Sequence, residues 1–183
     1  MKKLLSLFVI LLISCGISYS QNYICKDGYI RFFSTTPMED IEGISKEAVS
    51  VLNTSTNDIV FKVTITSFKF NSSLMQDHFN ENYMESGKYP TAVFKGKINE
   101  KIDWAKDGTY NISATGTMNC HGTDKQIIEK GTLTISKGTI IVKTSFKMKL
   151  EDYKVEIPQI VFNKIAESVD VTTNSTYLPY VKK

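Results

Sequence analysis

The chain has 183 residues, with 22 basic side chains, 19 acidic side chains and 42% apolar residues. This length and composition fit one globular domain and exclude a disordered, fibrous or collagen-like protein. The apolar segment at residues 4–13 follows two lysines and is about half as long as the roughly 20 residues that a membrane-spanning helix needs. We therefore predict a secretory signal peptide over residues 1–20 and no transmembrane span.

The small side chains of Ser18 and Ser20 favour cleavage after Ser20, so the predicted mature domain covers residues 21–183. Removal of Lys2 and Lys3 lowers the formal net charge from +3 to +1. A nearly neutral domain lacks the basic surface that nucleic-acid binding requires, so we expect no nucleic-acid partner. The expected location is the periplasm or the extracellular space.

The three cysteines leave open how the signal segment is processed and whether the mature domain has a disulfide. Cys15 follows Leu-Ile-Ser, as in a lipoprotein signal, so acylation and anchoring through Cys15 is an alternative to cleavage after Ser20. Cys25 and Cys120 would reach an oxidising compartment where a disulfide is permitted, but their separation of 95 positions does not show whether they meet. We favour their interpretation as two small apolar residues.

Beyond residue 21 the chain has no linker or low-complexity segment, and apolar and polar residues alternate with many β-branched and aromatic side chains. This pattern is typical of β-strands. It predicts eight strands, over residues 29–33, 47–52, 58–70, 91–101, 109–120, 125–136, 139–150 and 164–173. The third strand changes phase near its end, which indicates a bulge near Ser67. Lys137-Gly138 should form the turn of a hairpin.

One helix is predicted over residues 73–83, where Ser73 and Gln76 have the spacing of a capping box. Eight antiparallel strands with one apolar face can close into a barrel that has no free edge. The predicted fold class is therefore all-β, an eight-stranded antiparallel, lipocalin-like barrel with one short helix.

The strand at residues 139–150 decides which face of the barrel is polar, because its apolar residues alternate with Lys143, Lys147 and Lys149. In an outer-membrane barrel, each of these lysines would cost about 2 to 4 kcal/mol if it faced lipid at the midplane. Turned inward, they would crowd a narrow lumen with positive charge. A soluble barrel with the lysines outside and the apolar residues inside is therefore favoured.

Three residues on the predicted inner face are small, namely Gly96, Ala114 and Gly116. Small inward residues can leave room for one slender ligand, as in lipocalins. Glycines can equally mark bends in the strands of a barrel with a solid core. The spacing alone does not decide between these two interpretations.

Four short motifs occur in order: His-Phe at 78–79, Lys-Tyr-Pro at 88–90, Gly-Thr-Tyr at 108–110 and Gly-Thr-Met-Asn-Cys-His-Gly-Thr-Asp-Lys at 116–125. This succession resembles the YceI-like family of bacterial periplasmic proteins over about residues 28–171. The resemblance implies a barrel that encloses a long amphiphilic lipid, namely a polyisoprenoid, an isoprenoid quinone or a fatty-acid derivative. Cys120, Thr123 and Asp124 depart from the family's pattern of Ile, Val and Thr, so the resemblance leaves the identity of the ligand open.

Burial alone can bind such a ligand, because each CH₂ group removed from water contributes roughly 0.8 kcal/mol. Flexible methionine side chains suit a ligand of variable shape. Ordinary core packing is the competing explanation for each lining residue. The predicted lumen is lined by Phe61, Val63, Ile65, Phe94, Ile112, Met118, Val142, Phe146 and Met148, and Leu74, Met75 and Phe79 on the helix close one end.

The sequence offers little for catalysis or metal binding. The grouping most like a metal site is Cys120-His121 with Asp124, but a zinc site needs three or four converging ligands. No Gly-x-Ser-x-Gly nucleophile motif occurs. We therefore predict no catalytic residues, no metal and no cofactor. His121 is interpreted as a turn residue whose ring bonds to the backbone, and His78 as a helix residue with satisfied hydrogen bonds.

The predicted function is non-enzymatic binding, transport or sequestration of a long-chain lipid. One alternative is a secreted barrel enzyme that acts on a small hydrophobic substrate and depends on His121 or Asp124. Another alternative is a solid-cored interaction module. The head group of the lipid, its donor and acceptor, and the oligomeric state, a homodimer included, stay open.

Overall fold

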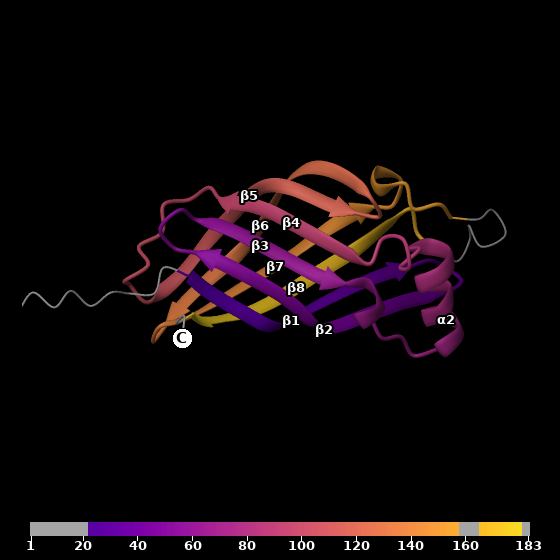
Figure 1. Cartoon of the computed structure of the whole chain (residues 1–183), viewed down its shortest axis with the longest axis horizontal. Helices are drawn as coiled ribbons and strands as arrows, with labels where there is room; N and C mark the ends of the chain where they lie inside the picture. The colour runs from indigo at the N-terminus through magenta and orange to yellow at the C-terminus, as the bar shows by residue number, and fades with distance from the viewer. Residues whose placement is uncertain (1–21, 158–164, 181–183) are drawn as a thin grey trace, which may run out of the picture.

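The computed structural model describes residues 22–157 and 165–180, which form one closed antiparallel barrel of eight strands (Figure 1). Each strand pairs with its neighbours in sequence, and β1 pairs with β8 to close the barrel. The predicted fold class is confirmed. The strands are β1 (Asn22–Thr35), β2 (Asp40–Asn53), β3 (Asp58–Thr64), β4 (Thr91–Ile98), β5 (Gly108–Cys120), β6 (Thr123–Ser136), β7 (Thr139–Lys149) and β8 (Ser168–Pro179).

Short helical segments lie between β3 and β4 and after β7. They are η1 (Ile65–Ser67), α2 (Ser73–His78), the π-helical turn η2 (Phe79–Tyr83) and η3 (Glu151–Tyr153). Figure 1 shows α2 at one end of the barrel, here called the α2 end, and the C-terminal end of β8 at the other. Within the described residues, no helix has the length and apolarity required to cross a bilayer.

The end of β3 differs from the prediction, because the strand stops at Thr64 and turns instead of bulging near Ser67. The Ser67 hydroxyl donates to the Thr64 carbonyl oxygen at 2.6 Å and closes the turn locally. Ser67 Oγ also lies 2.7 Å from Ser45 Oγ of β2. The 3₁₀ turn thus directs the following residues over the α2 end, where Phe68 is buried.

The predicted helix occupies the expected residues, but its cap is wrong. Ser72, not Ser73, is the N-cap, and its side chain accepts a hydrogen bond from the Met75 backbone N–H. Ser72 has extended backbone angles, whereas Ser73 is already helical. The predicted box with Gln76 therefore starts one residue too late.

The first two strands are much longer than predicted, with 14 residues each. Register shifts between Cys25 and Gly28 and between Gly28 and Ile30 interrupt β1. Such irregularities break the two-residue period, so the alternation rule does not detect the first half of the strand. The last strand, β8, extends to Pro179 and begins at Ser168; residue 164, where its start was predicted, lies outside the described residues.

Two tight turns carry positive φ angles at both central residues. Lys137 and Gly138 have φ of 49° and 78°, and the predicted β6–β7 hairpin is confirmed. His121 and Gly122, with φ of 49° and 70°, join β5 to β6 in the same way. Both pairs match the two-residue hairpin turn that follows the twist of the strands.

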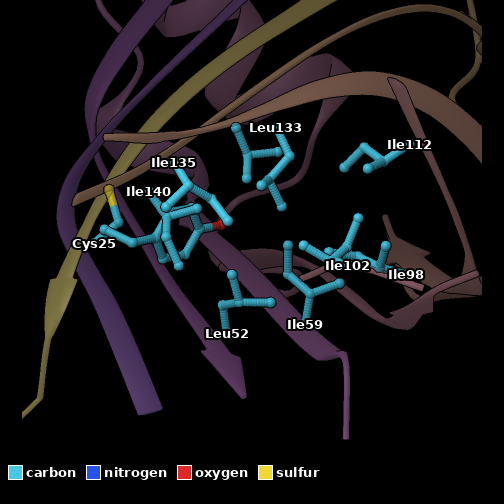
Figure 2. Close-up of a cluster of buried hydrophobic side chains, with 11 residues drawn as sticks. Cys25, Leu52, Ile59, Ile98, Ile102, Ile112, Leu133, Ile135 and Ile140 are labelled. Atoms are coloured by element: carbon cyan, nitrogen blue, oxygen red, sulfur yellow. The ribbon is translucent and has the colours of Figure 1, made fainter. Parts of the chain in front are cut away.

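The end of the barrel away from α2 is filled by its own side chains. Eleven residues from different strands and the β4–β5 connection project into a common interior (Figure 2). Most are branched aliphatic residues, which pack densely in fixed rotamers. The members of this cluster, here called the closed-end cluster, are Cys25, Leu52, Ile59, Ile98, Ile102, Ile112, Leu133, Ile135, Ile140, Val142 and Tyr177.

Gly96 and Gly116 face each other across β4 and β5. A Cβ atom at Gly96 would lie 2.6 Å from the Thr115 carbonyl oxygen, and one at Gly116 would lie 2.3 Å from the Lys95 carbonyl oxygen. These glycines therefore permit close approach of two backbones, which explains their small size without a ligand. Ala114, in contrast, lines an internal cavity.

Replacement of Gly116 by alanine should destabilise the barrel by about 1 to 3 kcal/mol, because the new methyl group overlaps a backbone carbonyl that cannot move independently. Urea denaturation measures the change. Gly87→Ala is the matched control, since a Cβ at Gly87 has no atom within 4 Å. Equal stability of the two variants would contradict the close-approach explanation.

Candidate functional site: an internal apolar cavity

Two adjoining cavities lie inside the barrel, with volumes of about 150 Å³ and about 90 Å³. Their walls share Ile30, Met118 and Phe146, so the cavities meet at these three side chains. The larger cavity lies toward the α2 end, where Met75 and Phe79 form part of its wall. The smaller one reaches the closed-end cluster at Ile59, Ile98 and Tyr177.

No lysine, arginine, aspartate or glutamate is among the described residues that line the larger cavity. Its wall consists mainly of aliphatic, aromatic and methionine side chains, and its only polar groups among the described residues are the hydroxyls of Ser34 and Tyr83 and the thiol of Cys120. Burial raises the pKa of the Cys120 thiol to about 12, with a partial opposing effect of the His121 backbone N–H, so this thiol is neutral near pH 7. The space therefore suits a hydrocarbon.

An aromatic cluster closes the α2 end. The Phe79 ring of η2 stacks on Phe32 of β1 with a centroid distance of 5.2 Å, and it contacts Phe70 at 4.9 Å and Phe68 at 5.6 Å. Gly43 of β2 makes room for this arrangement, because a Cβ there would lie 2.3 Å from the Phe32 ring. Phe79 thus holds the helical segment on the barrel and also forms part of the cavity wall.

Eleven of the twelve predicted lumen residues line the cavities, and Leu74 does not. Their positions follow the alternation in the strands, which turns every second side chain inward. Val63, Ile65, Met75, Phe79 and Met148 line the larger cavity; Phe61, Phe94, Ile112 and Val142 line the smaller one; Met118 and Phe146 line both.

Leu74 is 62% exposed, which corrects its predicted position on the inner side of the helix. Since α2 is capped at Ser72, Leu74 lies in its first turn. Met75 and Phe79 are four residues apart and share the inner face. Leu74 precedes Met75 by one residue and is therefore rotated by about 100° around the helix axis.

Several lining residues were not predicted. Ile30 and Phe32 in β1, and Val169 and Val171 in β8, alternate with the correct period and could have been assigned to the lumen from the pattern. Glu129 could not, because a search for apolar alternation passes over a carboxylate.

Polar side chains occur on the wall of the smaller cavity, and most have partners. Thr144 Oγ1 and Thr173 Oγ1 are 2.8 Å apart. Ser50 donates to the Val60 carbonyl oxygen at 2.7 Å, so the Tyr177 hydroxyl donates to Ser50 Oγ, also at 2.7 Å. Burial raises the pKa of Tyr177 despite its hydrogen bonds to serines, which keeps the phenol neutral.

His121 acts as a structural link between loops at the α2 end. Its Nδ1–H donates to the Tyr153 carbonyl oxygen at 3.1 Å, which confirms the predicted bond to the backbone. Nε2 lies 2.9 Å from Glu85 Oε2, and the Tyr89 ring packs edge-on at a centroid distance of 4.6 Å. The imidazole thus joins the β5–β6 turn to η3 and to the segment after η2.

His121 and Asp124, the two residues on which the alternative enzyme function depends, form hydrogen bonds with different residues. Asp124 accepts a hydrogen bond from Asn119 Nδ2 at 2.6 Å, whereas His121 contacts Glu85 and Tyr153. Across the two described ranges, no group of three or more His, Cys, Asp or Glu side chains is arranged to hold a metal ion. His78 is the last residue of α2 and is exposed.

Cys25 and Cys120 are free and buried. Cys25 belongs to the closed-end cluster, and Cys120 packs with Ile65, Met84, Tyr153 and Val155 near the α2 end. Both residues therefore fill apolar space, in agreement with the interpretation favoured from the sequence.

Solved structures of low sequence identity share this fold. A polyisoprenoid-binding domain from Saccharophagus degradans, implicated in plant cell wall breakdown, is similar with a TM-score of 0.75 and 15% identity over 87% of this chain and 99% of that one. Burkholderia cenocepacia BcnA has a TM-score of 0.69 and 13% identity, over 81% and 95% of the two chains. The Campylobacter jejuni YceI protein has a TM-score of 0.60 and 19% identity, over 76% and 85%.

At these identities, the solved structures establish a shared fold. No curated protein matches the chain in sequence. The sequence profile of the YceI-like domain matches residues 30–177, a span that begins in β1 and ends in β8. Since this match covers most of the chain and the whole circumference of the barrel, the protein belongs to the YceI-like family.

Proposed function

We propose that the protein binds a long-chain lipid in the barrel lumen and carries or sequesters it without chemical turnover. The observation that supports this function is the pair of adjoining cavities, the larger of which has no charged side chain among its described lining residues. A polyisoprenoid, an isoprenoid quinone or a fatty-acid derivative has the required long apolar chain.

The driving force for binding is the burial of the ligand's hydrocarbon chain. Each CH₂ group transferred from water contributes about 0.8 kcal/mol, so the burial of about fifteen carbon atoms contributes roughly 12 kcal/mol, which can exceed the cost of association. Met75, Met84, Met118 and Met148 line the larger cavity, and their unbranched side chains can adjust to a flexible ligand. The polyisoprenoid-binding domain of Saccharophagus degradans, which has the same fold, supports the choice of ligand class.

The alternative of a barrel with a solid core describes only the end of the barrel away from α2. The closed-end cluster packs like an ordinary protein interior, but the space between Ile30, Met118 and Phe146 and the α2 end is hollow. A cavity this apolar costs stability when it is empty, because its lining atoms lack contact partners. A bound hydrocarbon would supply those contacts.

The proposed location is the periplasm or the extracellular space, with lipid anchoring through Cys15 as the alternative. Residues 1–20 lie outside the described residues, so this proposal depends on the sequence pattern alone. The mass of the intact exported protein distinguishes cleavage after Ser20 from acylation at Cys15.

Organic extraction of the protein purified from its native host should release a long apolar molecule, identified by mass spectrometry, because an apolar cavity retains a hydrocarbon through purification. Extraction of a variant with Met118→Trp, which fills the junction of the two cavities, serves as the control. An empty extract together with no uptake of a fluorescent long-chain alcohol would contradict the carrier function.

Phe146→Lys and Met148→Lys should each abolish uptake of a fluorescent lipid, since a lysine ammonium group in the lumen costs several kcal/mol to desolvate. Val51→Lys is the matched control, because Val51 is 40% exposed on the outer face of β2 and the same substitution there should leave uptake unchanged. Circular dichroism verifies folding. Normal uptake by a folded Phe146→Lys or Met148→Lys variant would contradict the lumen assignment.

A further inference from the structure

Glu129 is the one charged side chain among the described residues that line the two cavities. It lies in the middle of β6, where Ile127, Glu129 and Gly131 alternate inward and all three line the smaller cavity. Its neighbours Ile128 and Lys130 face outward and are exposed. A carboxyl group thus occupies a position that the barrel pattern reserves for apolar residues.

The pairing of β6 explains why a carboxyl group is tolerated there. Residues 123–135 of β6 pair with β5, but β6 pairs with β7 only from Gly131, opposite Thr144, to Ser136, opposite Thr139. Residues 123–130 of β6 have no partner on β7, and residues 145–149 of β7 pair with β8 alone. Glu129 therefore lies two residues beyond the last β6–β7 pair, where the two strands separate and water can reach the carboxyl group.

The surroundings of Glu129 leave space on the inner side. Ala114 lies opposite it on β5, and Gly131, the next inward residue of β6, has no side chain. Thr144, Thr173 and Ser175 add hydroxyl groups to the same cavity wall. Among the described residues, the smaller cavity therefore contains the only carboxyl group and most of the hydroxyl groups of the two cavities. The larger cavity is nearly all apolar.

The Glu129 carboxyl has no compensating cation. Within the described residues, no hydrogen bond or ion pair involves its side chain, and no lysine or arginine lines either cavity. Burial raises the pKa of Glu129. Its charge is also close enough to Tyr153 of η3 to raise the pKa of that phenol, although burial is the largest cause there. The carboxyl group lacks a hydrogen-bond donor, which a ligand can supply.

We propose that Glu129 binds the polar end of the ligand, and that this end is a hydroxyl group that donates a hydrogen bond to the carboxylate. The inference depends on the proposed lipid-binding function and narrows its ligand class to long-chain alcohols and hydroquinones. The apolar chain then extends past Met118 and Phe146 into the larger cavity toward the α2 end.

The same geometry disfavours a phosphorylated lipid. A phosphate group beside Glu129 would place two anions in a cavity whose described lining provides no cation. A hydroxyl group instead forms a charge-assisted hydrogen bond to the carboxylate, which is stronger than a bond between neutral groups.

The test compares two probes with the same C20 isoprenoid chain, geranylgeraniol and geranylgeranyl phosphate, by displacement of a fluorescent long-chain alcohol from the purified protein. The wild-type protein should bind the alcohol at least about tenfold more tightly than the phosphate. Glu129→Gln keeps an acceptor oxygen but removes the charge, so this preference should fall at least about fivefold. Glu129→Lys should reverse it.

Glu47→Gln is the matched control, since Glu47 is exposed on β2 and outside both cavities, and it should keep the wild-type preference. An unchanged preference in a folded Glu129→Gln variant, or equal wild-type affinities for the two probes, would overturn the role of Glu129 and leave the lipid-binding function standing. Failure of the wild-type protein to bind either probe would overturn both proposals. If Glu129→Lys does not fold, Glu129→Gln decides alone.

Discussion

Closure of the eight-stranded sheet is the constraint on which the rest of the structure depends. In a closed barrel each strand turns alternate side chains inward, so the interior is shared by the inward residues of all eight strands. A barrel of this size is just wide enough for side chains to fill it or for one small ligand to enter. The volumes of a few inward side chains therefore decide where the barrel is solid and where it is hollow.

One end of the barrel is solid and the other is hollow. Away from α2, branched residues such as Leu52, Ile135 and Ile140 meet at the centre and exclude a ligand. Toward α2, methionine and phenylalanine side chains line the wall and leave a cavity of about 150 Å³, which the Phe79 cluster covers. The same alternating pattern thus produces a densely packed end and an apolar cavity lined by flexible methionine side chains.

The polar side chains inside the barrel differ in whether they have hydrogen-bond partners in the protein. Tyr177 donates to Ser50, Ser50 donates to the Val60 carbonyl oxygen, and the hydroxyl groups of Thr144 and Thr173 bond to each other, so these groups have partners without a ligand. Glu129 differs, because its carboxyl group lies where β6 and β7 separate and has no partner within the described residues. This carboxyl group is the feature on which the proposed orientation of an amphiphilic ligand depends.

The sequence by itself determined the strand count, the inward and outward faces and the nine predicted residues of the strands and their ends that line the cavities, because these depend on a period of two residues that is local. Only the tertiary structure decided the register shifts around Gly28, the Ser72 cap that turns Leu74 outward, and the separation of β6 from β7 beside Glu129. Each of these depends on how neighbouring elements meet. Whether inward side chains touch across the barrel or leave a space is likewise set by distances between strands, which no local pattern contains.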